Sequence, residues 1–152
     1  MNLLRKFQKS ESSVITIISG LPRSGTSMMM KMLEAGGIVP LTDKIRGADI
    51  DNPNGYYEWE RAKKLPEGDT TWLDSAQGKS VKIISALLTH LPPGYHYKVI
   101  FLEREMGEIL ASQREMLARR NETTTAEDDA LMAGLFQKHL QEIDAFLAAR
   151  PD

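Results

Sequence analysis

The fold of this chain is organised around Val14-Ile-Thr-Ile-Ile-Ser-Gly20-Leu-Pro-Arg-Ser-Gly25-Thr-Ser27-Met-Met-Met-Lys-Met-Leu33. The β-branched residues within 13–19 are typical of a buried strand, so we expect the first strand there. Gly20 and Gly25 then bracket a tight loop of four residues. Apolar residues at helical spacing predict a helix over 25–36, which the pair Gly36-Gly37 would end.

A loop between a strand and a helix can bind an anion, because its backbone N–H groups and the helix dipole both favour negative charge. The usual phosphate-binding loop reads G-x-x-x-x-G-K-[ST], whereas Thr26 stands at the lysine position here. The nearest cation is Arg23, inside the loop. We therefore expect an anion-binding loop. The alternative is a plain strand-to-helix connection that needs glycine only for its backbone.

The composition is that of an ordinary globular chain. It has 152 residues, 41% hydrophobic and 26% charged, with a formal net charge of -2. This balance argues against a general binder of nucleic acid or of membrane surfaces. There is no cysteine, and no pair among the three histidines has the spacing of zinc ligands. Because the sequence has no evident signal segment or membrane span, we expect a cytoplasmic protein.

Further strands and helices alternate along the chain. We expect residues 1–12 to be a flexible lead-in and residues 13–152 to be one domain. The further strands are predicted at 81–84 and 97–102; short helical segments are predicted at 56–65, 71–76 and 87–91, and long helices at 106–119 and 126–149. Thr125 and Asp128 have the spacing of a capping box before the last helix. This alternation predicts an α/β fold with a short parallel sheet flanked by helices.

Cationic groups are predicted near the carboxyl ends of all three strands. Arg23 follows the first strand, Lys82 lies in the second, and Arg104 follows the third. Ligands of parallel sheets lie beyond these ends, so we expect the three residues at one rim. An arginine there would repel the Mg²⁺ that phosphoryl transfer requires and would attract a second anion. Transfer of a sulfuryl group, which carries a single negative charge, fits such a rim.

Two segments resemble motifs of the sulfotransferases that use 3′-phosphoadenosine 5′-phosphosulfate (PAPS). The first, similar to their 5′-phosphosulfate loop, is Leu21-Pro-Arg-Ser-Gly-Thr-Ser27. The second, which resembles their 3′-phosphate motif, is Lys98-Val-Ile-Phe-Leu-Glu-Arg104 with Ser112 eight residues after the arginine. Small bacterial sulfotransferase-like proteins also share stretches similar to Ala48-Asp-Ile-Asp-Asn-Pro-Asn-Gly-Tyr-Tyr-Glu58 and Met116-Leu117.

The resemblance covers most of 13–149 and implies a three-layer P-loop NTPase-like fold, PAPS as the sulfuryl donor, and no catalytic metal. The residues implied to bind the nucleotide are Arg23, Ser24, Gly25, Thr26, Ser27, Arg104 and Ser112. Arg23 would also contact the bridging oxygen, and Lys82 would stabilise charge on the transferring group. The plain alternatives are a solvated loop cation for Arg23, an ion pair with Glu103, Glu105 or Glu108 for Arg104, and a strand-edge lysine for Lys82.

The catalytic base is not the usual residue of that family. Many cytosolic members carry a histidine two residues after the lysine, whereas Ile84 stands at this position. Glu58, which follows a rigid Asn-Pro-Asn-Gly turn, is the best replacement, because a carboxylate can accept a proton if its site raises its pKa. The rivals are Asp51, Glu60 and His90. A surface carboxylate at the start of a helix is the plain alternative for Glu58.

We therefore predict a sulfotransferase that moves a sulfuryl group from PAPS to a hydroxyl or amine of a small-molecule or carbohydrate acceptor. The alternatives are a P-loop module that binds an adenine nucleotide without catalysis, and a small-molecule kinase. Tyr56, Tyr57 and Trp59 would line an acceptor or adenine pocket, or belong to the core.

The family usually continues with a further strand beyond the point where this sequence stops. The P-loop sulfotransferase-like domain at 13–152 would thus be a minimal member, a fragment or a nonfunctional remnant. The last helix carries a long apolar stripe, which a homodimer or a further segment of chain would cover. Neither nucleic acid nor a membrane is an expected partner.

Overall fold

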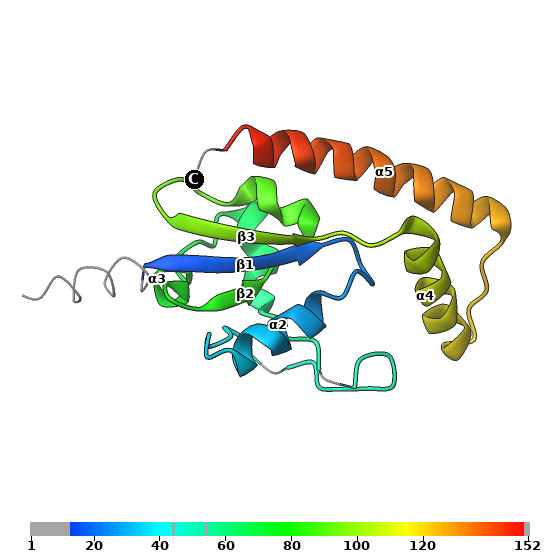
Figure 1. Ribbon diagram of the computed structural model, residues 1–152, viewed down its shortest axis with the longest axis horizontal. Helices are drawn as coiled ribbons and strands as arrows, with labels where there is room; N and C mark the ends of the chain where they lie inside the picture. The colour runs from blue at the N-terminus through cyan, green and yellow to red at the C-terminus, as the bar shows by residue number, and fades with distance from the viewer. Residues whose placement is uncertain (1–12, 44, 54, 151–152) are drawn as a thin grey trace, which may run out of the picture.

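The computed structural model describes residues 13–43, 45–53 and 55–150 (Figure 1). The predicted lead-in at 1–12 lies outside these residues. Strand β1 (Val14–Gly20) lies between β2 (Ser80–Lys82) and β3 (His96–Leu102), and it pairs with both in parallel. The predicted α/β fold, with a short parallel sheet flanked by helices, is therefore confirmed.

Strand β1 is central because its β-branched run can be buried on both faces. Ile15, Ile17 and Ile18 have no exposed surface. The strand register sets Ile18 beside Lys82 and Gly20 beside Leu102. Gly20 allows this close approach, because a Cβ added there would lie 2.7 Å from the carbonyl oxygen of Leu102. The carboxyl ends of the three strands thus meet at one rim, as predicted.

Helical segments cover both faces of the sheet. On one face, Ile15 and Ile17 join the main hydrophobic core. The elements on this side are η1 (Glu60–Glu67), α3 (Leu73–Ala76), η2 (Ser85–His90) and α5 (Ala126–Ala148). Side chains of a strand alternate between faces, so Ile18 points to the opposite side. There α2 (Thr26–Ala35) packs against β1 and β2 and contributes the fully buried Met30.

Two long helices follow the sheet. Helix α4 (Met106–Arg119) has the predicted bounds and lies beyond the end of the sheet (Figure 1). The predicted capping box of α5 is confirmed, because the Asp128 N–H donates to Thr125 Oγ1 at 3.1 Å and the Thr125 N–H donates to Asp128 Oδ2 at 2.8 Å. The first half of α5 runs past the sheet toward α4, which leaves Leu131 and Leu135 more than half exposed.

Several elements differ in their bounds from the sequence prediction; for example, the helical segments predicted at 71–76 and 87–91 are α3 at 73–76 and η2 at 85–90. The short helical segment predicted at 56–65 is present but shifted: residues up to Trp59 are not helical, and η1 (Glu60–Glu67) is a 3₁₀ helix that contains Pro66, which was expected to end it. Pro66 has no N–H to continue the helix and lies in the final turn of η1. The segment ends at Gly68, which has the left-handed conformation typical of a helix end. The strand predicted at 81–84 is shifted to Ser80–Lys82, because pairing with β1 begins at Ser80. Among the described residues, no helix is both long and apolar enough to cross a membrane.

Candidate functional site

The loop between β1 and α2 is held in a strained shape. Arg23 has a φ of 67°, a conformation that costs a non-glycine residue about 1–2 kcal/mol. The Ser24 hydroxyl donates to the Leu21 carbonyl oxygen at 2.7 Å, so this side chain is used inside the loop. Gly25, at φ 97°, is the N-cap of α2 and provides no side-chain cap. The first N–H groups of α2 are therefore directed at the space in front of the helix.

A pocket of about 340 Å³ opens at this loop. Its lining residues are Pro22, Arg23, Gly25, Thr26, Ser27, Met28, Arg46, Asp51, Asn52, Tyr56, Lys82, Arg104, Ser112 and Met116. Every residue predicted to bind the nucleotide except Ser24 is among them. Four cationic side chains face a single carboxylate in this lining, so the pocket is suited to an anion.

The two predicted nucleotide motifs are joined by direct hydrogen bonds. Arg23 Nε donates to Ser112 Oγ at 2.9 Å, although 89 residues separate them. Arg104 Nη1 donates to the Arg23 carbonyl oxygen at 3.0 Å. Arg104 Nε also pairs with Glu108 Oε2 at 2.9 Å, one of the ion pairs weighed as its plain role. The structure thus brings Arg104 and Ser112 to the loop. Arg104 contacts the loop and also forms the ion pair with Glu108.

Lys82 reaches the same pocket from β2. Its Nζ donates to Ser27 Oγ at 3.2 Å, and the Ser27 hydroxyl donates to the Tyr56 carbonyl oxygen at 3.4 Å. Burial lowers the pKa of Lys82 to about 8, because removal from water disfavours its charged form. Within the described chain, neither Lys82 nor Arg23 forms an ion pair with an acidic residue. These two cations are therefore available to a ligand.

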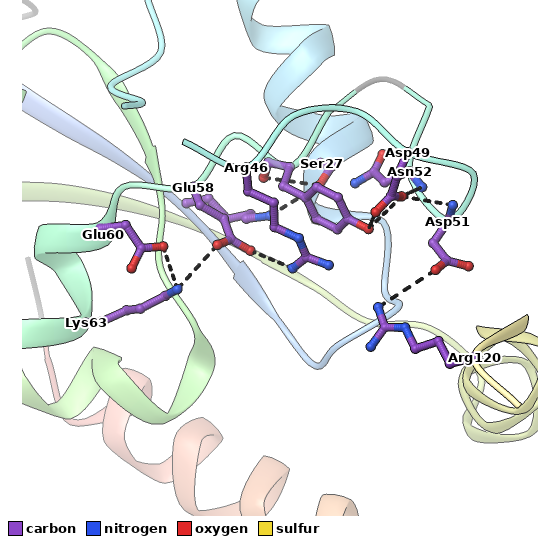
Figure 2. A network of polar contacts seen from close by, with 11 residues as sticks. Ser27, Arg46, Asp49, Asp51, Asn52, Glu58, Glu60, Lys63 and Arg120 are labelled. Carbon is purple, nitrogen blue, oxygen red and sulfur yellow. Dashed lines mark hydrogen bonds and ion pairs between the residues drawn. The ribbon is translucent and has the colours of Figure 1, made fainter. Parts of the chain in front are cut away.

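Arg46, Asp51, Asn52 and Tyr56 form one wall of the pocket, and sequence reasoning missed its cation, Arg46. The Arg46 guanidinium carbon lies 3.4 Å from the ring centroid of Tyr56, and its Nη1 lies 3.2 Å from Glu58 Oε1 (Figure 2). The Tyr56 hydroxyl donates to both carboxylate oxygens of Asp49 at 2.8 Å. No sequence signal pairs Arg46 with Tyr56, because the contact depends on how an irregular segment folds back.

Asp51 ties this wall to the end of α4. Its carboxylate accepts from Arg119 Nη1 at 2.7 Å and lies 3.8 Å from Arg120 Nη2, toward which it points in Figure 2. Only 6% of the Asp51 side chain is exposed. Asp51, a rival for the catalytic base, therefore lines the pocket but is already bound to arginine.

The structure does not bring Glu58 into the lining of this pocket. Its carboxylate lies between Arg46, at 3.2 Å, and Lys63 Nζ, at 3.3 Å (Figure 2). It borders a separate cavity of about 40 Å³, which Lys82 also lines. Lys63 is shared with Glu60, at 2.6 Å. The role of Glu58 as a base stays a prediction.

The remaining candidates lie elsewhere. His90 ends η2 and is not part of the pocket lining. The aromatic residues were expected either to line a ligand pocket or to belong to the core, and Trp59 packs against the main core. Tyr56 lines the pocket at the loop, and both Tyr56 and Tyr57 line a further cavity. The three neighbouring aromatic residues thus have different surroundings.

Searches of protein-family models, curated proteins and solved structures returned no match to this chain. Among the described residues, no group of three or more acidic, histidine or cysteine side chains is placed to hold a metal ion.

Proposed function

We propose that the pocket at the loop binds PAPS, and that the protein transfers its sulfuryl group to a hydroxyl or amine of a small-molecule or carbohydrate acceptor. The observation that carries this proposal is the contact between the two motifs, in which Arg104 donates to the carbonyl oxygen of Arg23 at a single cationic pocket. A ligand with anionic groups at two places, a 5′-phosphosulfate and a 3′-phosphate, matches two cationic motifs held side by side. A P-loop NTPase-like fold is part of the same proposal.

In the proposed reaction, the N–H groups at the start of α2 and the Arg23 guanidinium hold the 5′-phosphosulfate. The acceptor oxygen or nitrogen attacks sulfur in line while the bond from sulfur to the bridging oxygen breaks. The electron pair stays on that oxygen, so 3′-phosphoadenosine 5′-phosphate (PAP) leaves and the acceptor proton passes to a base. Lys82 and Arg23 stabilise the charge that develops on the sulfuryl and bridging oxygens.

A non-catalytic nucleotide-binding module is the second candidate. The observation that favours it is the position of Glu58, which two cations hold outside the pocket lining. Glu58 therefore contacts Arg46 and Lys63 and is not placed to take a proton from an acceptor in the pocket at the loop. The same nucleotide would bind, but no sulfuryl group would be transferred.

The proposal is tested by calorimetric titration with PAP in the absence of Mg²⁺, compared with ATP plus Mg²⁺. We expect PAP to bind without metal and more tightly than ATP. Binding of ATP plus Mg²⁺ alone would instead indicate phosphoryl transfer, which requires the metal. PAP release from PAPS, measured with a panel of alcohols and amines, then separates the enzyme from the module. Binding of PAP without any acceptor-dependent release would identify the module.

A further inference from the structure

A second cavity, of about 530 Å³, lies beside the pocket at the loop. The two cavities share the side chains of Arg46 and Tyr56 as a common wall. Besides this wall, the second cavity is lined by Glu34 near the end of α2, by Val39 and Thr42 in the segment after α2, and by Tyr57. Its volume is within the range of pockets that bind small molecules.

The backbone of Tyr57 is strained at this cavity. Among the described residues, three that are not glycine have a positive φ: Arg23, Tyr57 and Asn121. Asparagine tolerates this conformation, and Asn121 lies in the turn after α4. Arg23 lines the first cavity and Tyr57, at φ 53°, lines the second. Strain of this kind in a bulky residue is typical of ligand sites, because surrounding contacts must hold it in place.

One such contact fixes the Tyr57 side chain. Its hydroxyl donates to Glu34 Oε2 at 2.6 Å. The hydrogen bond to Glu34 raises the pKa of Tyr57 to about 12, because the nearby carboxylate disfavours the phenolate. The other carboxylate oxygen of Glu34 and the lone pairs of the tyrosine oxygen can still accept hydrogen bonds. The cavity therefore offers acceptors for ligand hydroxyl groups, and an aromatic residue, Tyr57, is part of its lining.

The charges of the two cavities differ. The first contains Arg23 and Lys82, which have no acidic partner in the described chain. In the second, Arg46 is paired with Glu58 at 3.2 Å, and Glu34 contributes a carboxylate. An anion would lose its hydration there without gaining an unpaired cation. A cation would be attracted by the Glu34 carboxylate but repelled by the Arg46 guanidinium in the same lining, which covers the Tyr56 ring at 3.4 Å. An uncharged ligand fits this lining best.

We propose that the second cavity binds an uncharged, hydroxyl-rich molecule containing a hexose-sized ring. Its hydroxyl groups donate to Glu34, and its ring packs on the side chain of Tyr57. The common wall of Arg46 and Tyr56 places this molecule next to the anion in the first cavity. Its identity as the sulfuryl acceptor rests on the proposed function, whereas the binding itself does not.

The test is an NMR titration of backbone amides with three sugars that share one ring. The probes are methyl β-D-glucopyranoside, the corresponding uronate, and the corresponding 2-amino-2-deoxy sugar. We expect the neutral glycoside to shift the amides of Val39, Gly55 and Tyr57, and the uronate to bind roughly tenfold more weakly. An absence of shifts at these amides, or tighter binding of either charged sugar, would overturn the assignment.

Two matched variants separate a loss of the ring from a loss of folding. Tyr57→Gly removes the ring and also the strain of a positive φ, which glycine adopts freely. The midpoint temperature of thermal unfolding should therefore be no lower than that of the wild type. We expect it to bind the neutral glycoside about tenfold more weakly, because the aromatic contact is lost. Asn121→Gly makes the same backbone change away from the cavity and should bind like the wild type. Wild-type affinity in Tyr57→Gly would contradict the proposal.

A parallel titration of the wild type with PAP separates this inference from the proposed function. Sugar binding without PAP binding would remove the sulfotransferase assignment and leave the second cavity as a polyol site. PAP binding without sugar binding would overturn the polyol site and leave the proposed function standing.

Discussion

At the scale of single residues, Lys82 combines burial with the positive charge that the proposed anionic ligand would contact. Burial lowers its pKa to about 8, below the value of 10.5 for an exposed lysine. Between these two pH values the unfolded chain binds more protons at this residue than the folded one. The contribution of Lys82 to stability therefore rises as the pH is raised through this window and is lowest below about 8. A bound anion has the opposite preference, because it attracts the protonated form.

We predict that the affinity for PAP falls as the pH is raised from 7 to 9. The phosphate groups have already lost their last protons near pH 6, so the change reports on the protein. Calorimetry across this range should show the decrease in the wild type and a weaker, pH-independent affinity in Lys82→Met. Lys98→Met, which removes an exposed lysine from β3, is the control. An unchanged pH profile in Lys82→Met would show that another group titrates.

The second residue-scale prediction concerns the proton acceptor. If Glu58 is the base, Glu58→Gln should slow sulfuryl transfer by about 10²–10⁴-fold, the usual contribution of general-base catalysis. Single-turnover PAP release measures this step separately from nucleotide binding. Glu60→Gln is the matched control, because Glu60 shares Lys63 with Glu58 but does not contact Arg46. A transfer rate in Glu58→Gln equal to that of the control would show that Glu58 is not the base.

At the scale of elements, the pocket wall formed by Arg46, Asp51, Asn52 and Tyr56 depends on its attachment to α4. Asp51→Asn keeps the shape of the side chain but weakens its ion pair with Arg119. Because Arg119 is 41% exposed, we expect a loss of only about 0.5–1 kcal/mol in the free energy of unfolding. Hydrogen exchange at 46–53 should nevertheless become faster, since the attachment is local.

Glu115→Gln is the control for this prediction. Glu115 pairs with the same Arg119, at 3.7 Å, but is 73% exposed and does not belong to the wall. Its substitution should leave hydrogen exchange at 46–53 unchanged. If both variants exchange at the wild-type rate, Asp51 does not hold the wall in place.

Local patterns predicted the elements that depend on local physics. The β-branched run of β1, the capping box at Thr125 and the bounds of α4 all followed from neighbouring residues. The rim also followed, because parallel strands end on the same side. The start of η1 could not be predicted in this way, because Trp59 packs against the core in an extended conformation. Arg46 and the contact of Asp51 with Arg119 also escaped prediction, because they join segments far apart in sequence.

At the scale of the whole molecule, one apolar face of α5 has no cover within the described chain. Leu131 and Leu135 lie one helical turn apart and are 66% and 55% exposed. The predicted homodimer would bury them, and it stays a prediction. Light scattering at micromolar concentration should give twice the mass of one chain, and Leu135→Lys should lower it to the monomer mass. A monomer mass for the wild type across this range would contradict the dimer.

The central claim is that two motifs from different parts of the chain bind one nucleotide. A substitution of Arg104 has two effects, because this residue also donates to the carbonyl oxygen of Arg23 in the loop. Arg104→Ala could therefore loosen the loop and weaken every nucleotide. A ratio of affinities removes this effect, since loosening acts equally on PAP and on adenosine 5′-phosphate, which lacks the 3′-phosphate.

The most direct measurement is thus the ratio of the two affinities, determined by calorimetry without Mg²⁺ for the wild type and for Arg104→Ala. A charged hydrogen bond contributes about 1.5–3 kcal/mol, so we predict that the preference for PAP falls by roughly ten- to a hundredfold in the variant. An unchanged ratio would contradict the account, because it would mean that Arg104 supports the loop without contacting the 3′-phosphate.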